Sequence, residues 1–270
     1  NHLETEEIPP QMQWEKPLEP VNIMKLDTDL RRAMEKMAKM NEIEKTLPGL
    51  DCGTCGAPSC RDLAEDIVRG AAKEFPVIES FVANSSFTLV MGSSWQPDED
   101  IVMPYFNEHP NMKLIVAPHE FDAERLSAIV GKTRRKAGLY SATSAENAAE
   151  LDCLVIDCFG ILSSLYRYGQ MAYIGGGFGA GIHNINEAAV YGIPVVFGPK
   201  FGKFAEAHDL IAFGGGHCIN NAQEFADLMD KMLNNPAALE NSGNIAGNYI
   251  STHIGATSRI YRELFPKRRQ

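Results

Sequence analysis

The sequence contains no long apolar stretch. A transmembrane helix needs about 20 consecutive apolar residues, and no run in these 270 residues approaches that length. The opening residues, NHLETEE, are too acidic for the start of a signal peptide. These absences predict a soluble protein of the cytoplasm.

Basic residues are not in surplus either. The chain has 25 Lys and Arg against 35 Asp and Glu, which gives a formal net charge of −10. A nucleic-acid-binding protein needs a basic surface, and the basic tail at 267–269 is too short to supply one. We therefore expect no nucleic acid among the partners.

Cysteine is too sparse for a disulfide scaffold, with six in 270 residues. Cys52, Cys55 and Cys60 are bunched, whereas the other three lie in or beside apolar runs. Bunched thiols in a chain of this length indicate metal or redox chemistry in a reducing compartment.

The length of the chain and its 44% hydrophobic content predict two folded units. Residues 1–22 are rich in Pro and Glu and are expected to be an extended arm. A helix capped by Asp27 or Asp29 should follow, because apolar residues recur at spacings of three and four until Pro48 and Gly49 end it. Its Met-rich stripe is expected to pack into a core.

Residues 50–60, LDCGTCGAPSC, place three thiols in a C-x2-C-x4-C run ahead of a second helix expected at 61–73. Glycine and proline between thiolates let the backbone wrap around a cluster and direct N–H groups at its sulfurs. The segment LPGLDCGTCGAPSCRDLAEDIVRG resembles the small domain that binds a 4Fe–4S cluster in hydrogenase-related and electron-transfer proteins. The resemblance implies Cys52, Cys55 and Cys60 as cluster ligands.

That family has a fourth cysteine about one helix further on, where this sequence has EFPV at 74–77. A cubane cluster needs four protein ligands or an outside substitute. Three thiolates leave several alternatives open: a cluster with an open iron, a labile or three-iron cluster, or no cluster.

From residue 87 onward, short apolar runs alternate with amphipathic helices. This order predicts an α/β fold, a parallel sheet wrapped by helices with ligands at the carboxyl ends of the strands. Residues 222–264 are expected to form two or three helices that cover the sheet. The expected strands are 87–91, 113–117, 139–140, 152–156, 171–174, 193–197 and 217–219.

The loops after these strands have unusual compositions, and the one after 171–174 is a glycine cluster. Gly175, Gly176 and Gly177 let the backbone turn sharply or approach a ligand, and a helix starting near Asn184 would direct free N–H groups at an anion. A nucleotide or sugar nucleotide is the predicted ligand. An NAD-dependent oxidoreductase is an alternative that ranks lower, because the next strand ends without the carboxylate that a dinucleotide fold needs.

Residues 77–266 resemble the C-terminal half of bacterial Kdo transferase, which moves 3-deoxy-D-manno-octulosonic acid (Kdo) from CMP-Kdo onto the lipid A precursor in lipopolysaccharide biosynthesis. The resemblance implies a GT-B glycosyltransferase, a fold of two Rossmann-like domains with the catalytic cleft between them, of which this half binds the donor and needs no cofactor. It is carried by GSSWQPDED at 92–100, LIVAPHEFDAERL at 114–126, FGILSSLYRYG at 159–169, YIGGGFGAGIHNINEAAVYGIPVVFGP at 173–199 and FGKFAEAHDL at 201–210.

The resemblance implies a role for each matching residue. The glycine cluster and the helix near Asn184 would hold the CMP phosphate, and Glu187 would accept hydrogen bonds from ribose hydroxyls. Ser93 and Ser94 would face the sugar or phosphate, and His119 would lie near the nucleotide. The implied donor site is completed by His183, Lys203 and Glu206.

Two segments depart from the family pattern. KFAE at 203–206 stands where many members have Asn-Phe-x-Glu, and PHE at 118–120 stands where members often have Pro-Arg-His. The missing arginine would leave one phosphate contact to Lys200 or Lys203.

In that family the N-terminal domain binds the acceptor, supplies the catalytic carboxylate and often carries the segment that associates with the inner face of the inner membrane. Residues 1–76 resemble an unrelated module instead, so we expect a fusion with its junction between Gly70 and Pro76. A natural two-module protein is the alternative. The predicted division is an arm at 1–22, an iron–sulfur-type helical module at 23–75 and a donor-binding domain at 76–270.

This division predicts binding of CMP or CMP-Kdo without transfer. No catalytic residue is assigned, and the lipid A precursor would be a partner only with the missing domain. A function of another class, an electron-transfer module with the larger domain as passenger, is the alternative.

Overall fold

The computed structural model describes residues 26–27, 29–47, 49, 57, 59–70, 75–253 and 263–264. The expected arm at 1–22, Cys52, Cys55 and most of the expected junction lie outside the described residues. All seven predicted strands are confirmed. Their bounds are β1 Phe87–Ser94, β2 Met112–Pro118, β3 Ala137–Leu139, β4 Cys153–Val155, β5 Met171–Ile174, β6 Val195–Phe197 and β7 Gly216–Cys218.

The strands form one parallel sheet in the order β3-β4-β2-β1-β5-β6-β7. β1 lies at the centre, where it pairs with β2 on one side and with β5 on the other. Since all strands run the same way, every carboxyl end lies at one edge of the sheet. The predicted α/β class is therefore confirmed.

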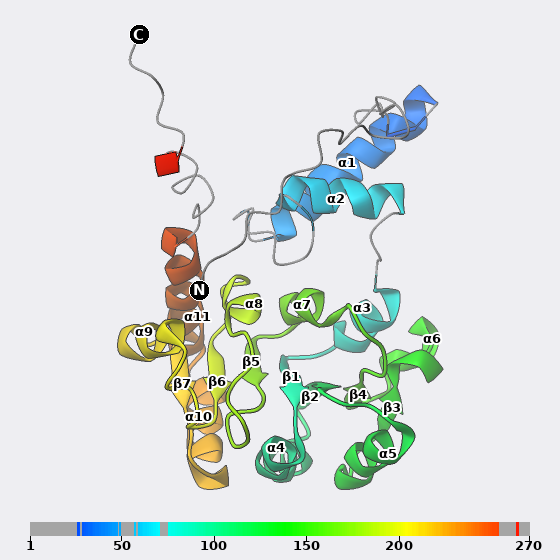
Figure 1. Cartoon of the computed structure of the whole chain (residues 1–270). Helices are drawn as coiled ribbons and strands as arrows, with labels where there is room; N and C mark the ends of the chain where they lie inside the picture. The colour runs from blue at the N-terminus through cyan, green and yellow to red at the C-terminus, as the bar shows by residue number, and fades with distance from the viewer. Residues whose placement is uncertain are drawn as a thin grey trace, which may run out of the picture.

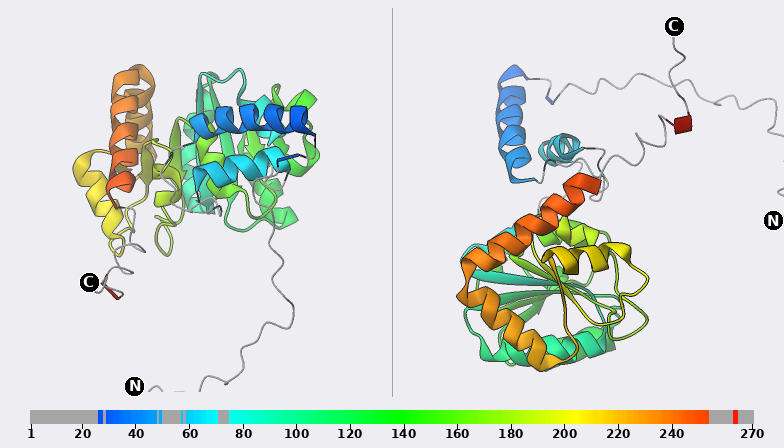
Figure 2. Two further views of the ribbon diagram at one scale, coloured as in Figure 1. Left: turned by 90° about the horizontal axis from the view of Figure 1, so that it is seen from above. Right: turned by 90° about the vertical axis from the view of Figure 1, so that its left-hand side faces the viewer.

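Helices cover both faces of the sheet (Figure 1). Figure 2 shows the strands between the two helix layers. One face carries α4 Gln96–Glu108, α5 Ala123–Lys132 and α10 Ala222–Asn234. The other carries α3 Pro76–Val82, α6 Ala145–Ala148, α7 Leu162–Leu165, α8 Asn186–Ala189, α9 Ala205–Phe213 and α11 Pro236–His253, with 3-10 turns η1 Tyr140–Ala142 and η2 Tyr166–Tyr168.

Two apolar cores follow from the alternation of side chains along each strand. Leu89 and Met91 of β1 lie in the core beneath α4 and α10, whereas Val90 lies in the core beneath α7, α8 and α11. All three are completely buried. A strand covered on both faces reads as a continuous apolar run, which is why these strands could be recognised in the sequence.

The first two helices, α1 Leu30–Thr46 and α2 Cys60–Arg69, share a third core. Asp29 caps α1 by accepting a hydrogen bond from the N–H of Arg32 at 3.0 Å. α2 ends at Arg69, earlier than expected, because Gly70 adopts the left-handed conformation with φ 74° and closes the helix.

The Met-rich stripe of α1 packs only in part. Met40 is buried against α2, but the side chains of Leu30, Met34 and Met37 are 77%, 66% and 50% exposed. The prediction that the whole stripe lies in a core is wrong for these three residues. α2 has 10 residues against 17 in α1, so it is too short to cover the longer helix.

Candidate functional site

Four loops meet at the carboxyl edge of the sheet. The N–H of His119, after β2, donates to Ser94 O of β1 at 3.0 Å. The N–H of Gly175, after β5, donates to Gly92 O of β1 at 2.9 Å, and that of Lys200, after β6, donates to Gly177 O at 2.9 Å. These hydrogen bonds bring the segments after β2, β5 and β6 together with the end of β1.

The glycine cluster passes very close to the end of β1. A Cβ on Gly175 would lie 2.1 Å from Ser93 O, and a Cβ on Gly177 would lie 2.5 Å from Gly198 N. Gly176 has a φ of 90°, and Ser93 itself has a φ of 51°, which is uncommon for a residue with a side chain. Only glycine fits these contacts.

Most backbone N–H groups near the cluster already have partners. Gly175 donates to Gly92 O, and Gly176 donates to Asp98 Oδ2 at 2.9 Å. The helix expected near Asn184 begins at Asn186 and has only four residues. The N–H of Asn186 donates to Asn184 Oδ1 at 3.1 Å. An anion at this edge would therefore depend mainly on side chains.

Three rings form a row above the edge. His119 stacks on Trp95 with ring centroids 4.6 Å apart and lies 4.6 Å from His183. The N–H of His183 donates to Gly175 O at 3.2 Å, so its position depends on the glycine turn. Burial and the neighbouring His119 lower the pKa of His183. The row offers two imidazoles to a ligand.

Glu187 lies in α8, where Asn184 Nδ2 donates to its carboxylate at 3.1 Å. Half-burial raises the pKa of Glu187. Tyr166 is fully buried beneath, and a Cβ on Gly92 would lie 1.9 Å from its hydroxyl oxygen. The absence of a side chain at Gly92 thus makes room for this tyrosine close to Glu187.

Two adjacent buried acids, Asp98 and Glu99, support the site from the first turn of α4. Asp98 accepts hydrogen bonds from the Tyr173 hydroxyl and from the N–H groups of Trp95 and Gly176, each at 2.9 Å. Sequence reasoning missed this acid. The available signal was an acid three residues after a cap position, as in a capping box.

Glu99 is completely buried and forms ion pairs with Arg125 and Lys132. It also accepts a hydrogen bond from Ser94 Oγ at 3.0 Å. Ser94 is only 1% exposed. Of the two predicted serines, Ser94 therefore supports the end of β1 from below, and Ser93 is the half-buried bulge residue of that strand, which has no pairing partner in β2.

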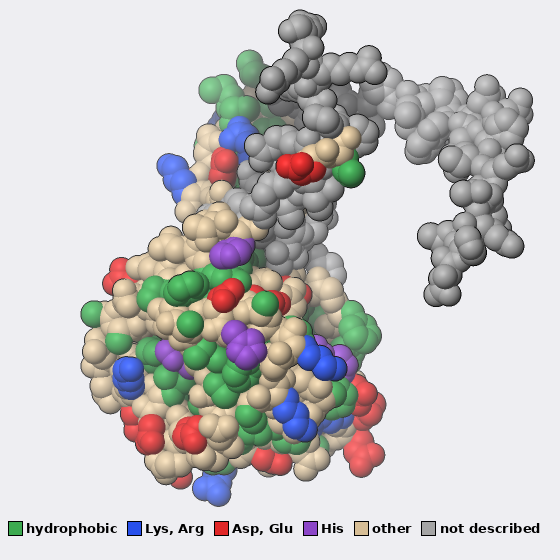
Figure 3. Space-filling model, turned by 60° about the vertical axis from the view of Figure 1, so that its left-hand side comes forward, with side chains coloured by type: hydrophobic (Ala, Val, Ile, Leu, Met, Phe, Trp, Pro, Cys, Tyr) green, Lys and Arg blue, Asp and Glu red, His purple; other side chains and the backbone are tan. Residues whose placement is uncertain are grey.

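Lys203 and Glu206 lie further along, in the loop after β6 and the first turn of α9. In the described part of the chain, no hydrogen bond or ion pair links either of them to the residues above. Lys200 is closer, because its Nζ donates to Gly179 O at 2.7 Å. On the face drawn in Figure 3, acidic and basic side chains are scattered among one another.

The proposed cluster ligands can be placed only in part. Cys60 is the first residue of α2 and is buried. Over the described residues, no three His, Cys, Asp or Glu gather to hold a metal. Cys153, Cys158 and Cys218 belong to the sheet domain, in β4, the loop after it and β7. Cys52 and Cys55 lie outside the described residues.

None of the helices in the described ranges has both the length and the apolar character needed to cross a bilayer.

Comparisons with known proteins confirm both resemblances. A family model described as "Putative Fe-S cluster" matches residues 47–74. The 3-deoxy-D-manno-octulosonic acid transferase of Chlamydophila psittaci is 29% identical over 144 residues, 52% of this chain and 33% of that protein. The corresponding transferase of Aquifex aeolicus is 30% identical over 171 residues, 60% of this chain and 47% of that protein.

Among solved structures, the C-terminal CMP-Kdo binding domain of WaaA from Acinetobacter baumannii superimposes with a TM-score of 0.55 at 22% identity. The match covers 66% of this chain and 98% of that domain. The likeness shows that the sheet domain has the fold of a Rossmann-like half of a GT-B glycosyltransferase. The chain spans less than half the length of the two transferases that it matches.

Proposed function

We propose that residues 77–266 bind CMP-Kdo as the donor half of a Kdo transferase. The observation that carries the proposal is the pair of His119 and His183 at the carboxyl edge of one parallel sheet, with Glu187 hydrogen-bonded to Asn184, the residue after His183. Ligands of open α/β sheets bind outside the carboxyl ends of the strands. The similarity to Kdo transferases supports the choice of the sugar nucleotide.

Each group has a chemical part in this proposal. The Glu187 carboxylate accepts hydrogen bonds from ribose hydroxyls. An ionised carboxylate can only accept hydrogen bonds, and hydroxyl groups can donate them. The two imidazoles and the ammonium group of Lys200 or Lys203 offer N–H donors to the phosphate. Ser93 Oγ can donate to the sugar or phosphate, while Ser94, bonded to Glu99, holds the loop in place.

Transfer of Kdo to an acceptor is a separate question from donor binding. The match covers less than half the length of each of the two transferases. We expect these 270 residues, tested alone, to bind the donor without transferring it. Kdo transfer to lipid IVA by the purified chain, above a blank without protein, would contradict this expectation.

Replacing Glu187 tests the donor site directly. Glu187→Ala is expected to weaken CMP binding by about 10- to 100-fold, since a hydrogen bond to a charged group contributes about 1.5–3 kcal/mol. Isothermal titration calorimetry of wild type and variant with CMP gives the two affinities. Glu240→Ala, on the exposed face of α11, is a matched control that should bind CMP like wild type.

A second function is favoured by the family match over residues 47–74. Cys60, with Cys52 and Cys55, would hold iron through three thiolates and give the helical module a redox role. Anaerobic reconstitution should then give absorbance at about 400 nm that is lost in Cys60→Ser. Reconstituted protein with less than about 0.1 iron per chain would rule this function out.

A further inference from the structure

We propose that Asp98 is the positioning residue of the donor site, which holds the glycine turn after β5 and, through that turn, His183. The expected effect of Asp98 on nucleotide binding rests on the function proposed above. The effect of Asp98 on the glycine turn is independent of that function.

Asp98 joins three elements through one buried carboxylate. Oδ2 accepts the N–H groups of Trp95, at the start of α4, and of Gly176, in the turn, both at 2.9 Å. Oδ1 accepts the hydroxyl of Tyr173, in β5, also at 2.9 Å. The residue is 1% exposed. The hydrogen bonds join the start of α4, the last part of β5 and the turn into one unit.

The contacts continue from the turn to the site. Gly176 O accepts the N–H groups of Gly179 and Gly181, at 2.9 and 3.1 Å, which closes the turn on itself. Gly175 O accepts the N–H of His183 at 3.2 Å. With a φ of 90°, Gly176 adopts a backbone conformation with many alternatives in a free chain, so an external partner is needed to select it. Asp98 is that partner.

A simple capping role does not account for the geometry. Capping of α4 uses only the hydrogen bond from Trp95, and an exposed acid can make that bond without burial. Burial raises the pKa of Asp98. Nor is the charge held by a lysine or arginine: Arg125 and Lys132 bind the adjacent Glu99, and over the described residues no Lys or Arg forms an ion pair with Asp98. The two side-chain oxygens are buried at a desolvation cost in the position where they bond the turn and β5.

Four variants separate positioning from charge and from bulk stability. Asp98→Asn removes the charge. Its amide oxygen can still accept both N–H groups while its NH2 group donates to the Tyr173 hydroxyl oxygen. Asp98→Glu keeps the charge but displaces it by one methylene. Asp98→Ala removes both the charge and the oxygens that accept the hydrogen bonds. Tyr173→Phe is the control, since it removes one hydrogen bond of Asp98 and leaves the bond to Gly176 intact.

Amide hydrogen exchange and CMP calorimetry are measured on all four variants. Asp98→Ala and Asp98→Glu are expected to speed exchange in peptides covering 175–183 by about tenfold or more and to weaken CMP binding by a similar factor. Asp98→Asn and Tyr173→Phe should stay within about threefold of wild type in both. If Asp98→Ala does not fold, the contrast between Asp98→Asn and Asp98→Glu still tests the proposal.

The proposal is overturned if Asp98→Glu matches wild type while Asp98→Asn loses protection, because charge would then matter and position would not. It is also overturned if the variants speed exchange equally in every peptide, which is the mark of lost global stability. Failure of the wild-type chain to bind CMP would contradict the proposed function, while exchange in 175–183 would still decide the role of Asp98.

Discussion

Gly175→Ala is expected to lower the free energy of unfolding by about 3 kcal/mol or more, at the upper end for inserted methyl groups. The new Cβ would lie 2.1 Å from Ser93 O and 2.6 Å from Ser93 C. Both atoms belong to the backbone of the central strand, which cannot move as a flexible side chain can. Urea unfolding followed by circular dichroism measures the change, and the melting temperature should fall by about 10 °C.

Gly179→Ala provides the control from the same loop. A Cβ there has Gly176 O at 3.5 Å as its nearest neighbour, an ordinary contact, and the residue is exposed. We expect its stability to lie within about 0.5 kcal/mol of wild type. Equal losses from the two substitutions would show that loop flexibility, and not the contact with Ser93, determines the effect.

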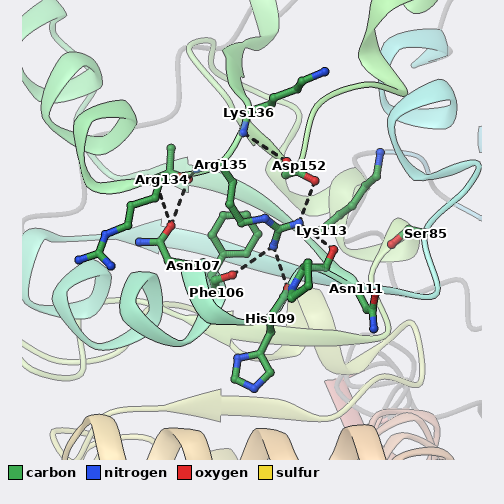
Figure 4. A network of polar contacts seen from close by, with 12 residues as sticks. Ser85, Phe106, Asn107, His109, Asn111, Lys113, Arg134, Arg135, Lys136 and Asp152 are labelled. Atoms are coloured by element: carbon green, nitrogen blue, oxygen red, sulfur yellow. Dashed lines mark hydrogen bonds and ion pairs between the residues drawn. The ribbon is translucent and has the colours of Figure 1, made fainter.

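Arg135→Ala is expected to cost about 2–4 kcal/mol of stability, since a hydrogen bond to a charged group contributes about 1.5–3 kcal/mol and this half-buried guanidinium makes several. Figure 4 shows its guanidinium among the carbonyl groups that end α4 and the Asp152 carboxylate. It donates to Phe106 O, His109 O and Pro110 O at 2.9–3.1 Å and to Asp152 at 2.8 Å. It also lies over the Phe106 ring, 4.2 Å from its centroid. Alanine would remove the guanidinium from all four acceptors, of which Phe106 O, His109 O and Asp152 would keep only a backbone donor.

Two further variants make the Arg135 prediction specific. Arg135→Lys should recover only part of the loss, because one ammonium group cannot reproduce the planar fork that reaches four oxygens. Arg134→Ala removes an exposed neighbour and should change stability by less than about 0.5 kcal/mol. Denaturant unfolding of the three variants measures these differences, and a loss in Arg134→Ala as large as in Arg135→Ala would contradict the account.

The inner strands β1, β2, β4, β5 and β6 were predictable because they are buried on both faces and are therefore mostly apolar. Their ends were harder to predict. β1 continues through Gly92 and Ser93 to Ser94, three residues beyond the apolar run, because Ser94 still pairs with Pro118 of β2. Pairing of polar residues at a sheet edge depends on the partner strand, which local composition does not reveal.

The candidate site was predictable where its residues follow a strand directly, as His119 and the glycine cluster do. The supporting acids were not, since their partners are distant in sequence: Asp98 bonds Gly176, 78 residues later, and Glu99 bonds Arg125, 26 residues later. A side chain's burial beneath a loop is a property of the tertiary structure. For the same reason Ser94 could not be distinguished from Ser93.

The Met-rich stripe of α1 shows the limit of periodicity in another way. Spacings of three and four correctly predicted a helix, but helix α2 covers only part of it. Periodicity identifies the side of a helix that is apolar. It carries no information about the length of the element that packs on that side.

The place of β1 at the centre of the sheet affects how the chain folds during synthesis. β2 follows β1 closely and can pair with it early, but the other neighbour, β5, comes much later: Thr88 and its hydrogen-bond partner Gln170 are 82 residues apart. Until β5 leaves the ribosome, the nascent chain exposes one edge of its central strand, a template for pairing with other chains. The interval over which residues 119–174 are translated therefore contributes to the time during which this edge of β1 is open to other chains.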